Sequence, residues 1–417
     1  MRMRIDWRFP STDMKAMRRS DSVAPAARDF LDWPFFEARH AEFVDQVAAF
    51  ADARQYEASR PDNVDALCRA LVADMGQAGL LAACVPGAYG GLSPAIESRH
   101  LALARETLAY RNGLADFAFA MQGLGSGAIG LAGSDALKAS VLPQVASGKL
   151  IPAFALSETN AGSDVAAMTC SARLDGDHYV INGEKTWISN GGIADLYTLF
   201  ARSEAAPGTR GISAFLVYPD DPGFSIAERI DVMAPHPLAT LRFTDMRIPA
   251  TRLLGAPGDG FKLAMRTLDI FRVSVAGAAL GFARRAFDEA VAHARSRQMF
   301  GATLADLQIT QSRLGEMAAA IDASSLLTYR AAWRRDVQHL PTTREAAMAK
   351  LSATENAQAV IDAALQMFGG RGVRCGAIME SLYREIRALR IYEGASEVQK
   401  LIVAREVLRQ SLPIPQS

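Results

Sequence analysis

A single carboxylate stands between an aromatic ring and a glycine in the stretch RIYEGASE, residues 390–397. Its neighbours Ile391 and Tyr392 are mostly apolar, and removing water from a carboxylate raises its pKa toward neutral pH. A group with such a pKa can both accept and return a proton. Gly394 leaves room for another molecule to approach the backbone. Glu393 is therefore a candidate general base, although an arbitrary glutamate at a helix break more often caps or solvates the helix end.

Two helices are predicted on either side of Glu393. Before it, apolar residues at spacings of four, four and three share one face of a helix over 376–390. After it, Ser396 and Gln399 have the spacing of a capping box and an apolar stripe follows them. Glu393 is thus expected in a short joint between two packed helices.

The composition is that of a large folded chain with no overall charge. Its 417 residues are 50% hydrophobic and 22% charged, enough for two or three domains. Because 45 Lys and Arg balance 45 Asp and Glu, no net field would attract nucleic acid or an anionic membrane. No apolar run approaches the ~20 residues of a membrane helix, and no secretion signal is evident. A cytoplasmic location is expected.

The four cysteines lack the spacing of a metal site. Cys68, Cys84, Cys170 and Cys375 fit neither a zinc site nor a disulfide framework, so we predict no metal and reduced, buried thiols. Residues 1–30 are basic but also contain aspartates, which argues against a transit peptide. A loosely ordered leader is expected there.

The periodic segments predict a multidomain α+β protein. Helical period dominates residues 31–150 and 257–417, whereas short β-rich runs fill residues 151–256. Strands gathered between two helical blocks favour separate domains over an alternating βαβ sheet. Asp175-Gly176 and Asn182-Gly183 predict hairpin turns. Strands are predicted over 170–174, 178–181, 196–202, 212–218 and 241–244, and long C-terminal helices over 259–296, 303–337, 342–368 and 376–390.

The chain resembles the acyl-CoA dehydrogenase family through five motifs in the family's order, over about residues 35–410. The motifs are FALSETNAGSD (154–164), KTWISNG (185–191), RQMFG (297–301), QMFGGRG (366–372) and the stretch from 390 to 406. The resemblance implies an N-terminal helical domain, a middle antiparallel β domain and a C-terminal four-helix bundle. It also implies oxidation of a fatty acyl thioester to the α,β-enoyl form.

The resemblance implies FAD, bound between the β domain and the C-terminal helices. No GxGxxG follows a predicted strand, so the residues alone do not predict a Rossmann site. The Trp187 indole would cover an apolar part of the flavin, and a buried core tryptophan is the alternative. The β-domain residues implied around the flavin are Phe154, Leu156, Ser157, Gly162, Ser163, Trp187, Ile188 and Ser189.

A second set of cofactor residues is implied to come from a neighbouring subunit. The guanidinium of Arg297 would bind the FAD pyrophosphate there, since its planar fork matches phosphate oxygens, and a solvated arginine is the alternative. The set is completed by Phe300, Gln308, Gln366, Gly369 and Gly370. The two glycines could equally end a helix. Two subunits at each flavin imply a homo-oligomer, with a tetramer as the family's precedent.

The resemblance gives Glu393 the role of the base that removes the α-proton while a β-hydride passes to the flavin N5. The thioester oxygen would be held by the Glu393 N–H and a ribityl hydroxyl of FAD. Phe271 stands where some family members carry the base, and phenylalanine cannot accept a proton. Asp269 and Arg272 resemble residues that contact substrate and support the glutamate, with a surface ion pair as the alternative.

Several other positions resemble substrate or cofactor contacts. Ser163 and Gly394 resemble substrate-contacting positions. Ala395 and Glu397 stand where threonine and glutamine are usual, so one hydroxyl contact to the flavin is absent and one acid is added. Glu397 also lies in the first turn of its helix, where a negative charge is favourable. The small residues of 122–127 could leave space for an acyl chain, and helix packing explains them equally well.

Three functions are consistent with these motifs. The first is a dehydrogenase that acts on acyl-CoA and passes electrons to an electron-transferring flavoprotein. The second is an oxidase that reduces dioxygen on the same scaffold. The third is a non-catalytic member that helps to assemble a larger complex. The acyl carrier could also be an acyl carrier protein rather than CoA.

Overall fold

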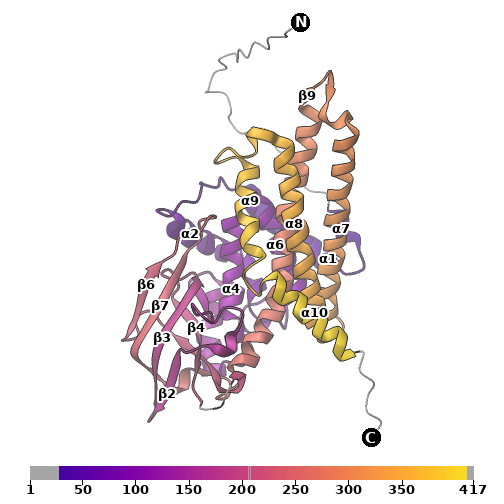
Figure 1. Cartoon of the computed structure of the whole chain (residues 1–417). Helices are drawn as coiled ribbons and strands as arrows, with labels where there is room; N and C mark the ends of the chain where they lie inside the picture. Colours follow the sequence, from indigo (N-terminus) through magenta and orange to yellow (C-terminus); the bar gives the residue numbers. More distant parts are fainter. Residues whose placement is uncertain (1–27, 205, 207, 411–417) are drawn as a thin grey trace.

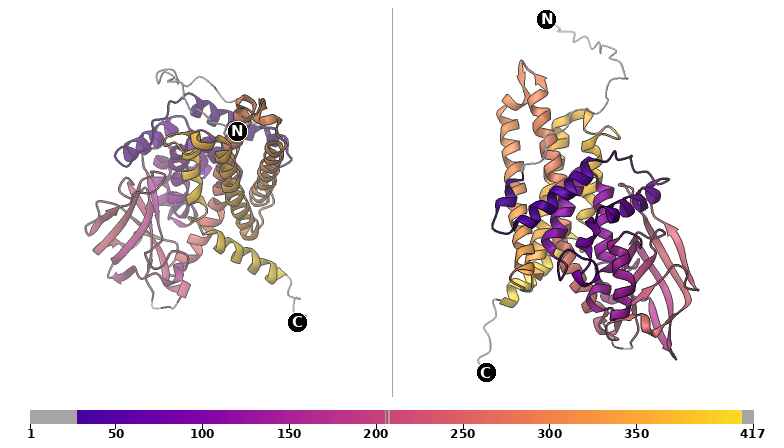
Figure 2. Two further views of the ribbon diagram at one scale, coloured as in Figure 1. Left: turned by 45° about the horizontal axis from the view of Figure 1, so that its top comes forward. Right: turned by 180° about the vertical axis from the view of Figure 1, so that it is seen from behind.

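The computed structural model describes residues 28–204, 206 and 208–410. The N-terminal helices lie between a twisted β-sheet and the long C-terminal helices (Figures 1 and 2). Of the predicted leader, residues 1–27 lie outside the described part. Phe30 is buried, and its ring stacks on that of Tyr329 with 5.5 Å between centroids. The chain that enters the first domain is therefore anchored on a C-terminal helix.

The N-terminal domain is helical, as predicted. Its helices are α1 (Ala38–Asp52), α2 (Val64–Gln77), α3 (Ser98–Arg111), α4 (Gly113–Ala132) and α5 (Asp135–Ala146). Helices α3 and α4 are separated by Asn112, whose side-chain oxygen accepts a hydrogen bond from the Ala115 N–H at 2.9 Å. This cap starts α4 in a new direction. Almost every residue of α4 from Leu114 to Ile129 is buried, so this helix lies at the centre of the molecule.

The middle domain is one mainly antiparallel sheet in the strand order β6-β7-β3-β2-β4-β5-β8, with β1 paired in parallel to β4. Two details differ from the sequence prediction. Asn182-Gly183 forms no turn, because β3 continues through it with a register shift between Ile181 and Gly183. The first, sixth and eighth strands were not predicted. The strands are β1 (Pro152–Ala155), β2 (Ser171–Asp175), β3 (His178–Ser189), β4 (Leu196–Arg202), β5 (Ile212–Val217), β6 (Phe224–Arg229), β7 (Leu238–Pro249) and β8 (Leu253–Leu254).

The C-terminal domain is built from long helices, as predicted. They are α6 (Gly260–Ser296), α7 (Gln308–Asp336), α8 (Thr343–Phe368), α9 (Ile378–Leu389) and α10 (Ser396–Gln410). A hairpin of β9 (Gln298–Met299) and β10 (Ala302–Thr303) joins α6 to α7 at one end of the bundle, and α10 leaves from the other end (Figure 1). None of the described helices is long and apolar enough to cross a bilayer.

Short 3-10 helices connect these elements. They are η1 (Asp29–Asp32), η2 (Leu80–Cys84), η3 (Gly87–Tyr89), η4 (Val165–Ala167), η5 (Gly208–Gly211), η6 (Ala250–Arg252), η7 (Leu304–Asp306) and η8 (Gly369–Arg371). The expectation of buried thiols holds for Cys68, Cys84 and Cys170. It is wrong for Cys375, which is exposed in the segment before α9.

Helices α3 and α6 approach each other closely because α6 presents glycines at the contact. A Cβ atom on Gly277 would lie 2.4 Å from the Ala102 carbonyl oxygen, and one on Gly281 would lie 2.2 Å from that of Glu106. The contact brings buried polar groups together, since Arg284 Nε donates to the Glu106 carboxylate at 2.7 Å. The N-terminal domain is thereby fixed against the C-terminal bundle along two long helices.

We predict that Gly281→Ala destabilises the protein by about 1–3 kcal/mol, the usual cost of forcing extra volume into a packed contact. The new methyl group would collide with backbone, which cannot rotate away. Gly315→Ala is the matched control, because that glycine lies in α7 with nothing within 4 Å of its added Cβ. There the change should be neutral or stabilising by up to ~1 kcal/mol. Denaturant unfolding of both variants measures the difference, and equal stabilities would contradict the close-contact interpretation.

Candidate active site

Glu393 lies in a joint, residues 390–395, between α9 and α10, as the sequence predicts. Helix α9 buries Met379, Leu382, Ile386 and Leu389 on one face, which fixes the end of the helix beside α8. The backbone then turns sharply, with positive φ at Glu393 (53°) and at Gly394 (92°). A glutamate in this region costs of order 1 kcal/mol or more, so its surroundings must hold it there.

The carbonyl groups of the joint are held by donors from three helices. Arg272 Nε of α6 donates to the Glu393 oxygen at 3.3 Å, and Lys350 Nζ of α8 donates to the Gly394 oxygen at 2.8 Å. Gln399 Nε2 of α10 donates to both oxygens, at 3.3 and 2.9 Å. Within the described residues, the amide N–H groups of 393–395 have no hydrogen-bond partner. The joint therefore uses its acceptors internally and leaves its donors free.

The predicted capping box at the start of α10 is wrong, although the helix does begin at Ser396. The Ser396 hydroxyl donates to the carboxylate of Glu355 on α8, and Gln399 reaches back to the joint carbonyls instead of the helix start. Both side chains are buried. The capping pattern thus marks the correct start of the helix, but the side chains of Ser396 and Gln399 bind tertiary partners and do not cap it.

The Glu393 carboxyl group is poorly hydrated but surrounded by charge. Burial raises its pKa, and the cations Arg105, Lys350 and Arg272 oppose that shift without cancelling it. Asp116 adds to the upward shift. The Oε2 atom of Glu393 is buried and has no hydrogen-bond partner among the described residues. An unpartnered carboxylate oxygen with a raised pKa is suited to accept a proton from a bound molecule.

Asp269 and Arg272 of α6 form the inner support of this joint, which excludes the alternative of an exposed surface pair. Arg272 is buried, and its Nη1 donates to Asp269 Oδ1 at 2.9 Å. The other Asp269 oxygen accepts from the Thr343 hydroxyl at 2.9 Å. Arg272 reaches the backbone of Glu393 and not its carboxylate, so in this structure it positions the joint.

A cleft of about 790 Å³ opens beside Asp269. Its walls come from α6, from the loop before α3, from the ends of α4 and α7, and from the segment that joins α7 to α8. The residues are Ser93–Glu97, Leu131, Arg266, Asp269, Ile270, Arg335, Asp336 and His339–Thr343. The cleft leads from the surface toward the support of the joint. It is large enough to hold much of a small-molecule ligand.

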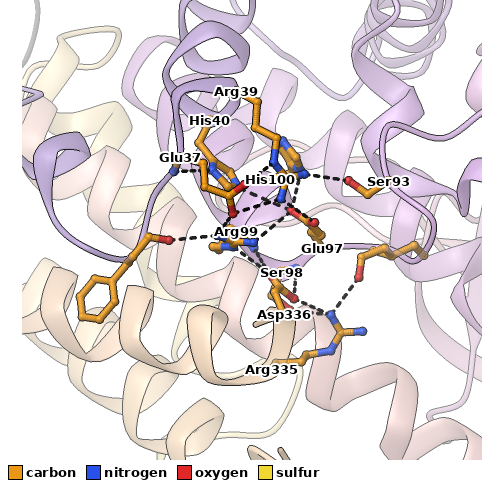
Figure 3. Close-up of polar contacts among 12 residues, drawn as sticks. Glu37, Arg39, His40, Ser93, Glu97, Ser98, Arg99, His100, Arg335 and Asp336 are labelled. Carbon is orange, nitrogen blue, oxygen red and sulfur yellow. Dashed lines mark hydrogen bonds and ion pairs between the residues drawn. The ribbon is translucent and has the colours of Figure 1, made fainter. Parts of the chain in front are cut away.

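A polar cluster fixes one wall of this cleft (Figure 3). The buried Asp336 carboxylate accepts the Ser98 and Arg99 amides at 2.9 and 2.8 Å, so α7 caps the start of α3. Farther back, His40, Glu97 and His100 bring possible metal-ligand atoms within 4.8 Å of one another. Arg39 and Arg99 already face the two Glu97 oxygens at 3.0 and 3.6 Å. This arrangement neutralises the carboxylate, and we assign no metal to it.

Phe271 occupies the space that the small residues of 122–127 could have left for an acyl chain. Its ring is buried, and a Cβ atom on Gly123 would lie 2.5 Å from it. A Cβ on Gly127 would lie 2.9 Å from Thr267, and one on Gly125 would lie 2.7 Å from the Pro152 backbone. Helix packing, the alternative interpretation of these glycines, is therefore what the structure shows.

The β-domain residues of the predicted cofactor site lie along one end of the sheet. Phe154 is in β1, Leu156 and Ser157 follow that strand, and Gly162 and Ser163 are exposed on the next loop. The Glu158 carboxylate pins this loop, because it pairs with Lys185 at 2.8 Å and accepts the Thr169 and Cys170 amides.

Trp187 is not a core residue. It is 58% exposed and has a φ of 60°, at a register shift between β3 and β7 that turns it out of the regular strand. The neighbouring Ile188 is buried and Ser189 ends the strand. An exposed indole held on a rigid strand provides a flat apolar surface for a ligand ring.

The end of β3 that carries Trp187 meets the helical bundle. Ser189 pairs with Leu238 at the start of β7, and His236, two residues earlier, lies 3.1 Å from the Glu385 carboxylate of α9. The His236 ring also packs on Phe117 of α4. The end of the sheet that carries Trp187 therefore lies beside α9, the helix that precedes the joint.

The second predicted set lies elsewhere in the chain. Arg297, Phe300 and Gln308 surround the β9–β10 hairpin, and Gln366, Gly369 and Gly370 lie at the end of α8. All six are exposed, Phe300 to 90%. In Figure 1 the hairpin is at the opposite end of the bundle from α10. One chain alone does not bring this set to the joint. Ala395 and the exposed Glu397 remain beside Glu393.

Three charged residues at the joint were missed by sequence reasoning. Arg105 donates two hydrogen bonds to Asp116, at 2.7 and 2.9 Å, and both are buried between α3 and α4. Lys350 is fully buried on α8. Charged residues inside otherwise apolar helical faces were the available signal, because such residues are rarely buried without a partner.

Comparisons with known proteins agree with this architecture. Models of the acyl-CoA dehydrogenase N-terminal, middle and C-terminal domains match residues 37–149, 153–246 and 258–408. The human mitochondrial short-chain specific acyl-CoA dehydrogenase is 40% identical over 376 residues, which cover 89% of this chain and 90% of that protein.

Solved structures show the same fold. Butyryl-CoA dehydrogenase from Megasphaera elsdenii matches with a TM-score of 0.83 and 31% identity over 90% of this chain and 99% of that one. A structure of the electron transferring flavoprotein of Acidaminococcus fermentans contains a chain with TM-score 0.83 and 33% identity over 90% and 99%. A glutaryl-CoA dehydrogenase from Mycobacterium smegmatis in complex with FADH2 matches with a TM-score of 0.81 and 26% identity, over 91% of this chain and 96% of that one.

We predict that Glu393→Gln raises the melting temperature at pH 8. The folded chain raises the pKa of Glu393, so it favours the protonated form, and stability from this group is lost as pH rises through that pKa. Glutamine removes the buried charge. The difference in melting temperature between the variant and the unaltered protein should shrink as the pH falls toward 5. Glu397→Gln, an exposed carboxylate near the joint, is the control; a pH-independent gap for Glu393→Gln would contradict the assignment.

Proposed function

This chain belongs to the acyl-CoA dehydrogenase family, and from that premise we propose that it oxidises the Cα–Cβ bond of an acyl-CoA thioester to the trans-2-enoyl form, with Glu393 as the base. One observation carries the proposal: the buried Glu393 carboxylate oxygen has no partner, next to an amide N–H that also has none. A base and an oxyanion donor are thus available to one substrate.

The residues present fit FAD. The exposed indole of Trp187 and the amides of residues 393–395, which have no hydrogen-bond partner among the described residues, support this fit. We propose that Phe154, Leu156, Ser157, Gly162, Ser163 and Trp187–Ser189 hold the flavin portion, with Ala395 and Glu397 nearby. Bound FAD would supply the acceptor for the hydride that leaves the β-carbon.

The protein's own groups account for the remaining chemistry. Glu393 takes the α-proton as the carbon–carbon double bond forms. The Glu393 N–H donates to the thioester oxygen, where negative charge grows. Arg272 and Asp269 keep the joint in place through the contacts described above. Gly394 and Ser163 are proposed to contact the substrate, and the cleft beside Asp269 is proposed to receive its CoA portion.

A short acyl group is the proposed substrate. The Phe271 ring closes the glycine-lined face of α4, so a long chain has no path along residues 122–127. The relatives support this choice, since the human protein is named for short-chain acyl-CoA and the Megasphaera protein for butyryl-CoA.

An electron-transferring flavoprotein is the proposed electron acceptor, supported by the structural match to a chain in an electron transferring flavoprotein structure. Rapid peroxide formation without a protein acceptor would instead favour the oxidase. We also propose a cytoplasmic location, on the strength of the three buried, unpaired thiols.

A homo-oligomer, with a tetramer as the expected size, is proposed to complete the cofactor site. The support is the exposed set of Arg297, Phe300, Gln308, Gln366, Gly369 and Gly370, which one chain leaves far from its joint. Leu401 and Leu408 of α10 are also exposed, although the sequence predicts an apolar packed face there. Exposed apolar side chains on one helix are suited to a contact between subunits.

We predict that butyryl-CoA bleaches the flavin absorbance under anaerobic conditions faster than octanoyl-CoA does. Glu393→Gln should slow the bleaching by at least about 10²-fold while FAD stays bound, the usual effect of removing a general base. Stopped-flow absorbance measures both. Acyl carrier protein thioesters in the same panel test the carrier. No bleaching by any thioester would favour the non-catalytic alternative, and near-normal bleaching by the variant would reject Glu393.

We predict that Arg297→Glu lowers the FAD content of the purified protein several-fold, because a carboxylate would repel the pyrophosphate that the guanidinium is proposed to bind. Arg295→Glu is the matched control, since that arginine is also exposed at the end of α6. Flavin released on denaturation, divided by protein, gives the occupancy. Equal occupancy in the two variants would contradict the assignment of Arg297.

A further inference from the structure

Lys350 is an unusual residue for the interior of a helical bundle. Its side chain is fully buried on α8, yet it makes no ion pair among the described residues. Its one hydrogen bond runs from Nζ to the Gly394 carbonyl oxygen at 2.8 Å. Burying an ammonium group without a carboxylate partner is costly. Because burial of this charge is costly, its presence points to a functional role for the ammonium group.

The hydrogen bond of Lys350 acts on the backbone that carries the base. A peptide group is planar, so a carbonyl held on the bundle side turns the following N–H to the opposite side. Lys350 thereby orients the Gly394–Ala395 peptide, while Arg272 and Gln399 hold the Glu393 carbonyl. The joint keeps its positive φ at Glu393 and Gly394 because these donors, from three different helices, all act on it.

The charge of Lys350 faces the base as well. Burial lowers the pKa of Lys350 to about 8, and Glu393 is the largest charge that opposes this shift. Arg272 of α6 lowers it further, while Glu355 of α8 and Glu397 of α10 raise it. Glu393 in turn faces Arg105, Arg272 and Asp116 besides Lys350. Loss of the Lys350 proton would therefore remove one of three cations around the base.

We propose that Lys350 is a positioning residue for the dehydrogenation, which holds the 390–395 joint in its active conformation and supplies a positive charge that keeps Glu393 available as a carboxylate. This inference rests on the proposed function, because it gives Glu393 the role of the base. It assigns a role to a residue outside every motif that the sequence offered.

Three variants test the inference. Lys350→Met removes the charge and the hydrogen bond, Lys350→Arg keeps a charge that persists at any accessible pH, and Lys149→Met alters an exposed lysine as the control. The rate of anaerobic flavin reduction by butyryl-CoA is measured against pH. For the unaltered protein we expect a decline above about pH 8, where Lys350 loses its proton.

The variants should differ in a defined way. The rate of flavin reduction in Lys350→Met should fall at least ~10-fold. This loss should be smaller than the about 10²–10³-fold loss that follows removal of a donor in direct contact with the oxyanion. Its alkaline decline should be absent, whereas Lys350→Arg should keep more of the rate and move the decline to higher pH. Lys149→Met should match the unaltered protein.

A second readout is independent of turnover. The infrared carbonyl band of protonated Glu393, identified by its loss in Glu393→Gln, is titrated in the unaltered protein and in Lys350→Met. The pKa of Glu393 should be higher in the variant, because a cation beside the carboxylate is gone. An unchanged band titration together with an unchanged rate profile would overturn the inference.

If Lys350→Met does not fold, an alkaline decline in Lys350→Arg identical to that of the unaltered protein overturns it. Failure of butyryl-CoA and all other thioesters to reduce the unaltered protein would instead reject the proposed function.

Discussion

The active region depends on a balance of buried charge around one carboxylate. Burial disfavours the ionised form of Glu393, and Arg105, Lys350 and Arg272 on the surrounding helices partly offset that cost. Arg105 in turn is tied to Asp116 in a two-point ion pair. Each of these charges comes from a different helix, α3, α8, α6 and α4. The chemistry of the joint therefore depends on how these four helices pack together.

The close approach of α3 and α6 makes that arrangement possible. Gly277 and Gly281 let the two backbones meet, which places Arg105 near the joint and Arg284 on Glu106. Arg105 also donates to Ser274 of α6 at 3.1 Å. Bulkier residues at the two glycines would separate the helices and leave these polar groups unpaired in an apolar interior, which is costly. Small residues on α6 thus serve the electrostatics of the site as well as its packing.

Sequence reasoning recovered the features that depend on local patterns. The long C-terminal helices, the strand at 196–202 and the break that carries Glu393 follow from periodicity and turn residues, and the structure confirms them. Asn182-Gly183 was misassigned because the same dipeptide that makes a hairpin also permits a bulge within a continuing strand. The roles of Lys350 and Arg105 could not be predicted, because each lies far in sequence from the joint and only the fold brings them together. The assignment of the cofactor residues stays a prediction. Its second set lies around the β9–β10 hairpin and the end of α8, and this distance from the joint is visible only in three dimensions.

The exposed tip at the β9–β10 hairpin has a thermodynamic consequence. Phe300 is 90% exposed, and among the described residues the neighbouring Arg297 side chain makes no hydrogen bond or ion pair. On the proposed assignment, these side chains find their partners only when a second subunit brings a cofactor to them. Cofactor occupancy and self-association would then be linked equilibria, each strengthening the other by mass action. Dilution alone would shed flavin, and added flavin would draw separated chains back together.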